Sequence, residues 1–239
     1  MKLDILVFAS HPDDAELGCS GTIVAHIAAG KKVGIVDLTR GELGTRGTPE
    51  TRLAESEAAS QIMGLAVRDN LDFADGFFVN DKAHQLKVVQ KIREYKPQLV
   101  IMNAIHDRHP DHGRGSQVVS EACFLAGLKM IETIGPEGEK QEAWRPKAVY
   151  HYIQDRYIKP DVIVDITPYW EQKLESIRAF KSQFFNPNDT SENTYISSPE
   201  FMEFLEARAK EFGHAIGVTY GEGFTVERHI GVKNLFDLI

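Results

Sequence analysis

Residues 3–29 read LDILVFASHPDDAELGCSGTIVAHIAA, and this stretch decides the fold. Its first part, residues 3–9, is a short apolar run that predicts a buried strand. A polar loop follows, and Gly18–Ala29 then carries apolar residues at helical spacing until Gly30, a residue type that commonly ends helices. A strand, a polar loop and a helix in this order indicate the start of a crossover unit, which joins parallel strands.

The same alternation continues to about residue 135. Further strands are predicted at residues 33–38, 67–73 and 99–102, and further helices at residues 49–63, 81–95 and 117–131. Strands that alternate with helices of this length imply right-handed crossovers and a parallel sheet that helices cover on both faces. The predicted fold class is therefore α/β, with a mostly parallel, Rossmann-like sheet.

Beyond about residue 135 the pattern becomes less regular. Strands are predicted at residues 147–153 and 162–166, helices at 169–180 and 199–212, and a mobile polar loop at 186–198. The sequence contains neither a linker nor an internal repeat. We therefore expect a single domain over residues 1–239, with a core at about 1–135 and a carboxyl-terminal α/β elaboration at about 136–239.

Composition limits the classes of partner. The 27 Lys and Arg residues face 35 Asp and Glu, giving a formal charge of −8 without a basic run, which disfavours nucleic acid as a partner. The amino-terminal residues lack the features of a signal peptide, and no apolar segment approaches the length of a membrane span, so no membrane is expected. Cys19 and Cys123 are too isolated for a disulfide framework or a structural thiolate zinc site, which predicts a cytoplasmic location.

Two polar loops that follow predicted strands carry the side chains able to do chemistry. They are His11-Pro12-Asp13-Asp14-Ala15-Glu16 and His106-Asp107-Arg108-His109-Pro110-Asp111-His112. Ligands bind at the carboxyl ends of parallel strands, so both loops should open on the same edge of the sheet. Residues three apart share one face of a helical turn, so His11 can align with Asp14, and His109 with His112. Together the loops predict a metal site, although either one alone is also typical of a capped, solvated turn.

The segments A-x-H-P-D-D-x-E-x-G at Ala9–Gly18 and H-P-D-H at His109–His112 resemble the two signatures of the LmbE or PIG-L-like family of metal-dependent N-acetylglucosamine deacetylases. The likeness covers nearly the whole chain, including residues 37–42, the helix of Arg52, and residues 182–184 and 221–224. It is closest to the branch that deacetylates N-acetylglucosaminyl-malate in bacillithiol biosynthesis. The resemblance implies a hydrolase that acts on a small acetylated aminosugar conjugate, and a homo-oligomer, with a hexamer as one candidate.

Carried over residue by residue, the resemblance implies that the metal ligands are His11, Asp14 and His112. Two imidazoles and one carboxylate leave a coordination position open for water, as catalytic zinc sites do. Metal coordination can lower the pKa of water from 15.7 to about 7, which makes a nucleophile for amide hydrolysis. The predicted cofactor is Zn²⁺, with ferrous iron as the alternative, because this ligand set accepts both.

The resemblance also implies the catalytic residues. Asp13 is the expected general base, and His109, oriented by Asp111, is the expected donor to the oxyanion. An adjacent carboxylate favours imidazolium, so we expect His109 to be charged. Whether Asp13 or His109 protonates the leaving amine stays open.

Arginines are the candidates for binding an anionic substrate. A planar guanidinium suits the carboxylates of a malate aglycone, and the resemblance favours Arg52 and Arg108 over Arg145. The alternative for each is a surface arginine paired with a neighbouring acid. Glu42 is a candidate for binding sugar hydroxyls, and Tyr195 is a candidate for a lid residue that reaches the site.

Other functions remain open at this point. A dinucleotide-binding oxidoreductase would place an acid such as Asp37 at the end of its second strand, but the first loop lacks G-x-G-x-x-G. A ferrous-iron oxygenase can use the same site of two histidines and one carboxylate. A deacetylase of another N-acetylglucosaminyl conjugate and a metal-stabilised scaffold without activity are further alternatives.

Overall fold

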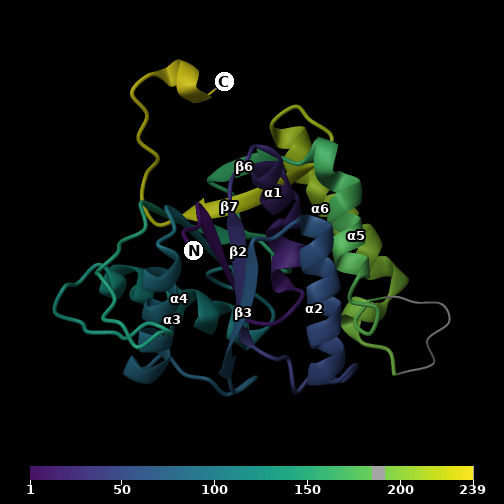
Figure 1. Ribbon diagram of the computed structural model, residues 1–239. Helices are drawn as coiled ribbons and strands as arrows, with labels where there is room; N and C mark the ends of the chain where they lie inside the picture. Colours follow the sequence, from purple (N-terminus) through teal and green to yellow (C-terminus); the bar gives the residue numbers. More distant parts are fainter. Residues whose placement is uncertain (185–191, 239) are drawn as a thin grey trace.

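The computed structural model describes residues 1–184 and 192–238, which form a seven-stranded sheet flanked by helices (Figure 1). The strands are β1 (Ile5–Ala9), β2 (Val33–Thr39), β3 (Val67–Phe73), β4 (Leu99–Met102), β5 (Ala148–Tyr152), β6 (Val162–Asp165) and β7 (Gly221–Val226). The α-helices are α1 (Asp14–Ala28), α2 (Pro49–Met63), α3 (Lys82–Tyr95), α4 (Pro110–Ala126), α5 (Trp170–Arg178) and α6 (Pro199–Ala215). Short 3₁₀ helices occupy Thr167–Tyr169, Tyr195–Ser197 and Leu235–Leu238.

The order of the strands is β3-β2-β1-β4-β5-β7-β6. All pairings from β3 to β5 are parallel, and β7 runs antiparallel to both of its neighbours. The structure thus confirms the predicted α/β class with a mostly parallel, Rossmann-like sheet. The sequence analysis missed β7, because Gly221 and Gly223 lower its apparent strand propensity. At Gly223 a Cβ atom would lie 2.9 Å from the Phe212 ring, so close packing explains the glycine.

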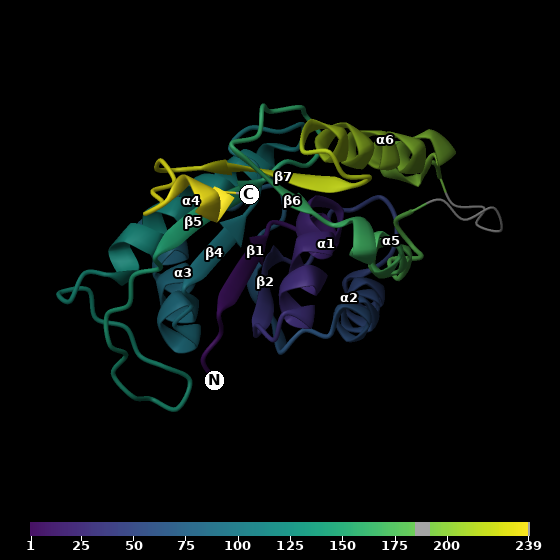
Figure 2. The same cartoon turned by 90° about the horizontal axis from the view of Figure 1, so that it is seen from above.

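Helices cover both faces of the sheet, and each face has its own core (Figure 2). The side chains of β1 alternate between the two. Ile5 and Val7 contact the core beneath α1, α2, α5 and α6, whereas Leu6 and Phe8 contact the core beneath α3 and α4. Burial on both faces explains why this strand is a continuous apolar run rather than an alternating one.

Helix α4 begins at Pro110 and ends at Ala126, so the predicted helix over residues 117–131 was placed too late. Pro110 occupies the first turn, where its missing N–H costs nothing, and Nδ1 of His109 accepts a hydrogen bond from the backbone N–H of Asp111 at 3.2 Å. The second signature is therefore the amino terminus of a helix. Likewise α1 begins at Asp14, within the first signature.

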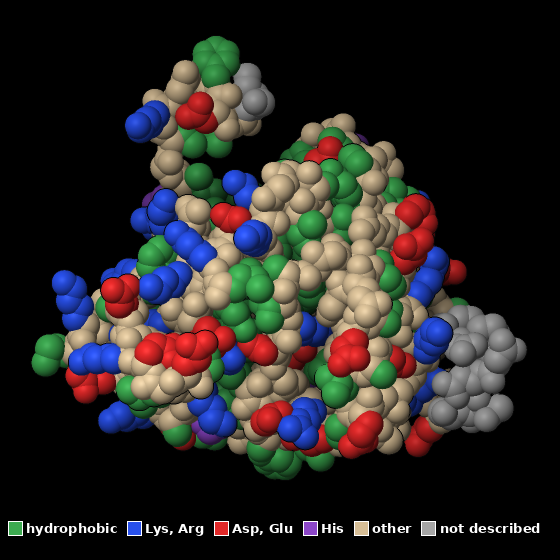
Figure 3. Space-filling view, in the orientation of Figure 1, with side chains coloured by type: hydrophobic (Ala, Val, Ile, Leu, Met, Phe, Trp, Pro, Cys, Tyr) green, Lys and Arg blue, Asp and Glu red, His purple; other side chains and the backbone are tan. Residues whose placement is uncertain are grey.

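The 3₁₀ helix at Leu235–Leu238 stands away from the body (Figures 1 and 3). Leu235 and Phe236 are about three-quarters exposed there, at 77% and 74%. The predicted loop at 186–198 falls partly outside the described residues, and its described part contains a 3₁₀ turn at Tyr195–Ser197. Within residues 1–184 and 192–238, no helix is both long and apolar enough to cross a membrane.

A buried arginine, Arg93, supports the loop after α4. It is 2% exposed and donates hydrogen bonds to the carbonyl oxygens of Ala126, Leu128 and Ile131. We expect Arg93→Met to lower the free energy of unfolding by about 2–4 kcal/mol, because buried carbonyl groups that lose their partner each cost about 1–3 kcal/mol. Urea denaturation followed by circular dichroism measures this loss, and a change below about 1 kcal/mol would contradict the assignment.

Candidate metal centre

The two signatures meet at the carboxyl edge of the sheet. His11 follows β1, and His109 and His112 follow β4, which pairs with β1. The ring centre of His11 lies 4.6 Å from that of His109 and 5.6 Å from that of His112. One donor atom from each of the three rings lies within 4.8 Å of the other two. Side chains nearly a hundred residues apart in the chain thus form one cluster, in which His11 and His112 are buried and His109 is half-buried.

Asp14 lies between two of these imidazoles. Its Oδ1 is 3.1 Å from Nε2 of His112, and its Oδ2 is 3.3 Å from Nδ1 of His11. Donor atoms that bind one tetrahedral ion with bonds of about 2.0 Å lie about 3.3 Å apart, so this spacing suits a small cation. The side-chain amides of Asn103 and Gln154 donate to the Asp14 carboxylate at 3.1 and 2.6 Å and hold it in place.

Each of these histidines has a carboxylate behind it. Nδ1 of His112 lies 2.5 Å from Asp107, and Nε2 of His11 lies 3.0 Å from Asp75 and 3.4 Å from Asp111. Metal-ligating histidines typically bind a carboxylate through their second nitrogen, which fixes the ring and its tautomer. The sequence analysis assigned no role to Asp75 or Asp107, although Asp107 belongs to the second loop and Asp75 follows a strand.

The charges of the cluster fit a bound cation. Burial alone lowers the pKa of His112, but Asp14 and Asp107 outweigh it and raise that pKa to about 9. Burial likewise acts to lower the pKa of His11, and hydrogen bonds to three carboxylates raise it well above its usual value: Asp111, Asp14 and Asp75. Carboxylates that hold protons on two buried imidazoles will also favour a divalent ion in place of those protons.

Asp13 stands beside the cluster in a strained conformation. Its φ of 117° and ψ of −24° lie in a region that side chains other than glycine rarely adopt. Such strain collects at functional sites, where the surrounding structure enforces it. Nη2 of Arg52 donates to Asp13 at 3.0 Å and to Gln183 at 2.7 Å, which fixes the carboxylate. Burial raises the pKa of Asp13 to about 7, although Arg52 acts against this rise.

Asp111 holds His109 through its backbone N–H, whereas its carboxylate has other partners, and the catalytic roles of both residues stay predictions. That carboxylate accepts hydrogen bonds from the backbone of Gly76 at 2.7 Å and from Arg114 at 2.5 Å. The His109 ring instead caps α4 through Nδ1, so its neutral form carries the proton on Nε2. Burial and the nearby His11 and His112 lower the pKa of His109, which favours its neutral form over the charged form expected from the sequence.

A cavity of about 330 Å³ opens beside the cluster, and it brings together most of the predicted site residues. Those on its wall are His11, Asp13, Asp14, Arg52, Arg108, His109, His112 and Tyr195. The guanidinium of Arg108 lies 4.5 Å from the ring centre of Tyr195, and its Nε is 3.6 Å from Asp155. The Arg108 side chain is 47% exposed, whereas that of Arg52 is 6% exposed and engaged by Asp13.

Two predicted substrate residues, Arg145 and Glu42, are not among the residues that line this cavity, and their roles stay predictions. Arg145 lies 4.4 Å from the ring centre of Phe124 and donates to the carbonyl oxygen of that residue, on a different cavity. Glu42 accepts hydrogen bonds from the backbone N–H groups of Arg40 and Asp75, so it shapes its loop instead. The sequence does not reveal that Arg145 contacts Phe124 or that Glu42 contacts the backbone of Asp75, because both contacts depend on how distant segments fold together.

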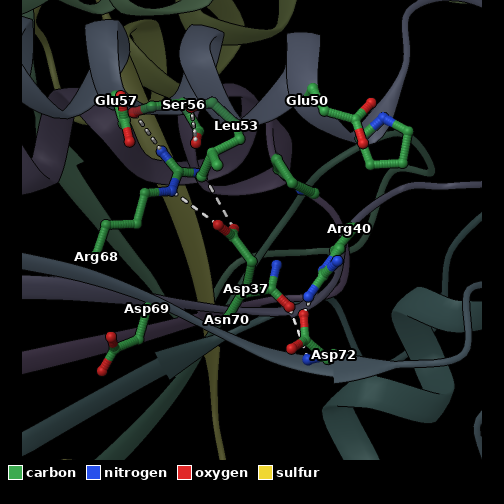
Figure 4. Close-up of a pocket in the computed structure, with 12 residues that line it drawn as sticks. Asp37, Arg40, Glu50, Leu53, Ser56, Glu57, Arg68, Asp69, Asn70 and Asp72 are labelled. Carbon is green, nitrogen blue, oxygen red and sulfur yellow. Dashed lines mark hydrogen bonds and ion pairs between the residues drawn. The ribbon is translucent and has the colours of Figure 1, made fainter.

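Asp37 is committed to a buried ion pair rather than to a ribose. Nε and Nη2 of Arg68 donate to its two oxygens at 2.8 and 3.1 Å (Figure 4). Nη1 of the same guanidinium donates to Glu16 at 2.6 Å. Asp37, which suggested a dinucleotide site, and Glu16, which belongs to the first signature, are therefore joined by Arg68 in one network of ion pairs.

These features define an α/β protein with a candidate metal centre of two histidines and one aspartate at the carboxyl edge of its sheet. Residues 6–123 match the model of the PIG-L family, described as GlcNAc-PI de-N-acetylase. The chain belongs to this family, as the two signatures predicted.

Three similar proteins illustrate the relationship. The conserved protein TT1542 from Thermus thermophilus, known from its crystal structure, is 36% identical, with a TM-score of 0.84 over 97% of this chain and 98% of that one. Diacetylchitobiose deacetylase of Thermococcus kodakarensis is 29% identical over 92% of this chain and 81% of its own. A probable N-acetyl-alpha-D-glucosaminyl L-malate deacetylase 2 of Bacillus anthracis is 28% identical over 84% and 91%.

Asp107 offers a test of the cluster that leaves all three candidate ligands intact. We expect Asp107→Asn to weaken Zn²⁺ binding about 10- to 100-fold, because the amide supports the His112 ring less well than a carboxylate does. Competition with a chelating dye measures the dissociation constant, and Asp237→Asn, on the distant carboxyl-terminal segment, serves as control. Equal affinity in both variants and the unaltered protein would rule out this role.

Proposed function

We propose that this chain is a metal-dependent N-deacetylase that hydrolyses the acetamide of an N-acetylglucosaminide. The observation that carries the proposal is the position of Asp14 between His11 and His112, with Asp13 beside it on the same cavity wall. Membership of the PIG-L family supports the same reaction, and so do two relatives named as deacetylases. In this proposal His11, Asp14 and His112 hold Zn²⁺, with ferrous iron as the alternative.

A bound ion of this kind supplies a water of lowered pKa and polarises the acetyl carbonyl. Asp13, held by Arg52, accepts the proton of that water as it attacks the carbonyl carbon. His109 donates from Nε2 to the developing oxyanion, and its cap on α4 fixes the ring for this task. The carbon–nitrogen bond then breaks, the amine takes up a proton and acetate leaves. Asp13, which has taken up the proton of the water, can donate it to the amine, whereas His109, the other candidate, could donate only from its charged form.

For the aglycone we propose a carboxylate-bearing group, with N-acetylglucosaminyl-malate of bacillithiol biosynthesis as the specific substrate. Arg108 supports this choice, since its half-exposed guanidinium is the right partner for a carboxylate at the cavity rim. A second contact between the aglycone and Arg52 stays a prediction, because Nη2 of Arg52 already donates to Asp13. The homo-oligomer, with a hexamer as one candidate, and the cytoplasmic location also stay predictions.

Two substitutions separate proton transfer from metal binding. We expect Asp13→Ala to lower kcat at least about a hundredfold while the bound metal stays, since general bases contribute about 10²- to 10⁴-fold. His11→Ala should instead lose the metal. An amine-release assay combined with elemental analysis checks both variants, and near-native turnover by Asp13→Ala would overturn the mechanism.

Conditions can separate a hydrolase from the other two uses of such a site. We expect the rate of amine release to be the same with and without oxygen, because hydrolysis consumes only water. An oxygenase would stop in the absence of oxygen. Removal of the metal by a chelator should abolish activity and leave the far-ultraviolet circular dichroism unchanged. Unfolding on chelation together with no amine release from any acetylated glucosaminide would point to a structural metal instead.

The aglycone is tested at Arg108. We expect Arg108→Ala to raise KM for N-acetylglucosaminyl-malate about 10- to 100-fold, because a hydrogen bond between charged groups contributes about 1.5–3 kcal/mol, and to leave KM for free N-acetylglucosamine unchanged. Arg145→Ala is the matched control, since that arginine faces another cavity. Steady-state kinetics on both substrates decide the matter, and equal kcat/KM of the unaltered protein for the two would refute the preference.

A further inference from the structure

Helix α1 is interrupted in its middle. Cys19 has φ −152° and ψ 16°, which divides the helix into a first turn at residues 14–18 and a longer part at 20–28. A break of this kind leaves carbonyl groups without partners before it and N–H groups without partners after it. Residues 14–24 are all buried, so these groups depend on the protein rather than on bulk water for their hydrogen bonds.

An ion pair from two distant elements fills this break. Nζ of Lys173, on α5, donates to the carbonyl oxygens of Glu16 and Leu17 at 3.0 and 2.8 Å. Glu222, on β7, accepts the N–H groups of Gly21 and Thr22 at 3.0 and 2.7 Å. The two side chains also bind each other at 2.7 Å.

The signs of the charges match the helix ends that they meet. The carboxyl end of a helical segment is partly negative and its amino end partly positive, so an ammonium suits the first end and a carboxylate the second. The side chains of Lys173 and Glu222 are 2% and 4% exposed, and all three ammonium protons have an acceptor. A buried pair is retained when its hydrogen bonds are complete in this way.

The segment that this pair holds carries the candidate chemistry. Residues 14–18 form little more than one turn, which is too short to be stable by itself. Its amino end bears Asp13 and Asp14, and the second of these is held by Asn103 and Gln154. Its carboxyl end is held by Lys173, only two or three residues from Asp14.

We propose that Lys173 and Glu222 are positioning residues, which fix the first turn of α1 so that Asp14 meets His11 and His112 at metal-binding distance. The inference rests on the proposed function in one respect, namely that Asp14 binds the metal. Both residues lie outside the part of the chain that matches the family model, residues 6–123. The carboxyl-terminal elaboration would thus set the metal affinity of a site built from the core.

The test compares Lys173→Met and Glu222→Gln with the unaltered full-length protein. We expect the dissociation constant for Zn²⁺, measured by chelator competition, to rise at least about tenfold, as happens when groups behind metal ligands are lost. The visible absorption spectrum of the Co²⁺-loaded protein should change, because the ligand geometry changes. In kinetics, kcat should fall while KM for the acetylated substrate stays within about twofold.

Arg93→Met is the matched control. Arg93 is also a buried cation that donates to backbone carbonyl groups, but it lies at the end of α3, away from the first turn of α1. It should lower Tm as the test variants do and leave the Zn²⁺ affinity and the Co²⁺ spectrum unchanged. If Lys173→Met fails to fold, Glu222→Gln decides alone, since its amide oxygen can still accept one of the N–H groups.

The outcomes separate the two proposals. Zn²⁺ affinity and Co²⁺ spectra in the folded variants equal to those of the unaltered protein would overturn the positioning role and leave the proposed function standing. An affinity loss as large in Arg93→Met as in Lys173→Met would also overturn it, since general destabilisation would then be the cause. No Zn²⁺ or Co²⁺ binding by the unaltered protein would overturn both.

Discussion

The parallel pairing of β1 with β4 is the constraint on which the site depends. Ile5 pairs with Leu99 and Val7 with Ile101, so the two strands end at the same edge of the sheet. Each strand is followed by a loop and the start of a helix, and histidine and aspartate lie at this junction in both cases. Without this register, the two signatures would lie apart and could not form one site.

Around this edge the structure balances charges that would be costly if buried alone. The imidazoles of His11 and His112 each lie between Asp14 and an outer carboxylate, and Asp13 is paired with Arg52. Every one of these groups is buried, so each needs a partner of opposite charge or a complete set of hydrogen bonds. In the proposed function, a divalent cation would take the place of the protons on the two imidazoles.

The later part of the chain takes part in this balance. Gln154 holds Asp14, Gln183 holds Arg52, and Lys173 with Glu222 joins the two parts of α1. These residues come from segments far from both signatures in the sequence. The carboxyl-terminal elaboration is therefore part of the support of the site as well as of the sheet.

Sequence periodicity was sufficient for most of the fold, since apolar spacing and residues such as Pro49 and Gly64 act locally. The expectation that the two polar loops meet at one edge of the sheet is also confirmed. It placed the start of α4 too late, although Pro110 and the His109 cap mark that start locally. It missed the strand at Gly221–Val226 because a distant partner decides there, since this strand packs closely against α6. The same holds for the direction of single side chains. Tertiary structure alone turned Arg52 toward Asp13, Arg145 toward Phe124 and the Asp111 carboxylate toward the backbone of Gly76, because hydrogen-bond partners are chosen in space and not along the chain.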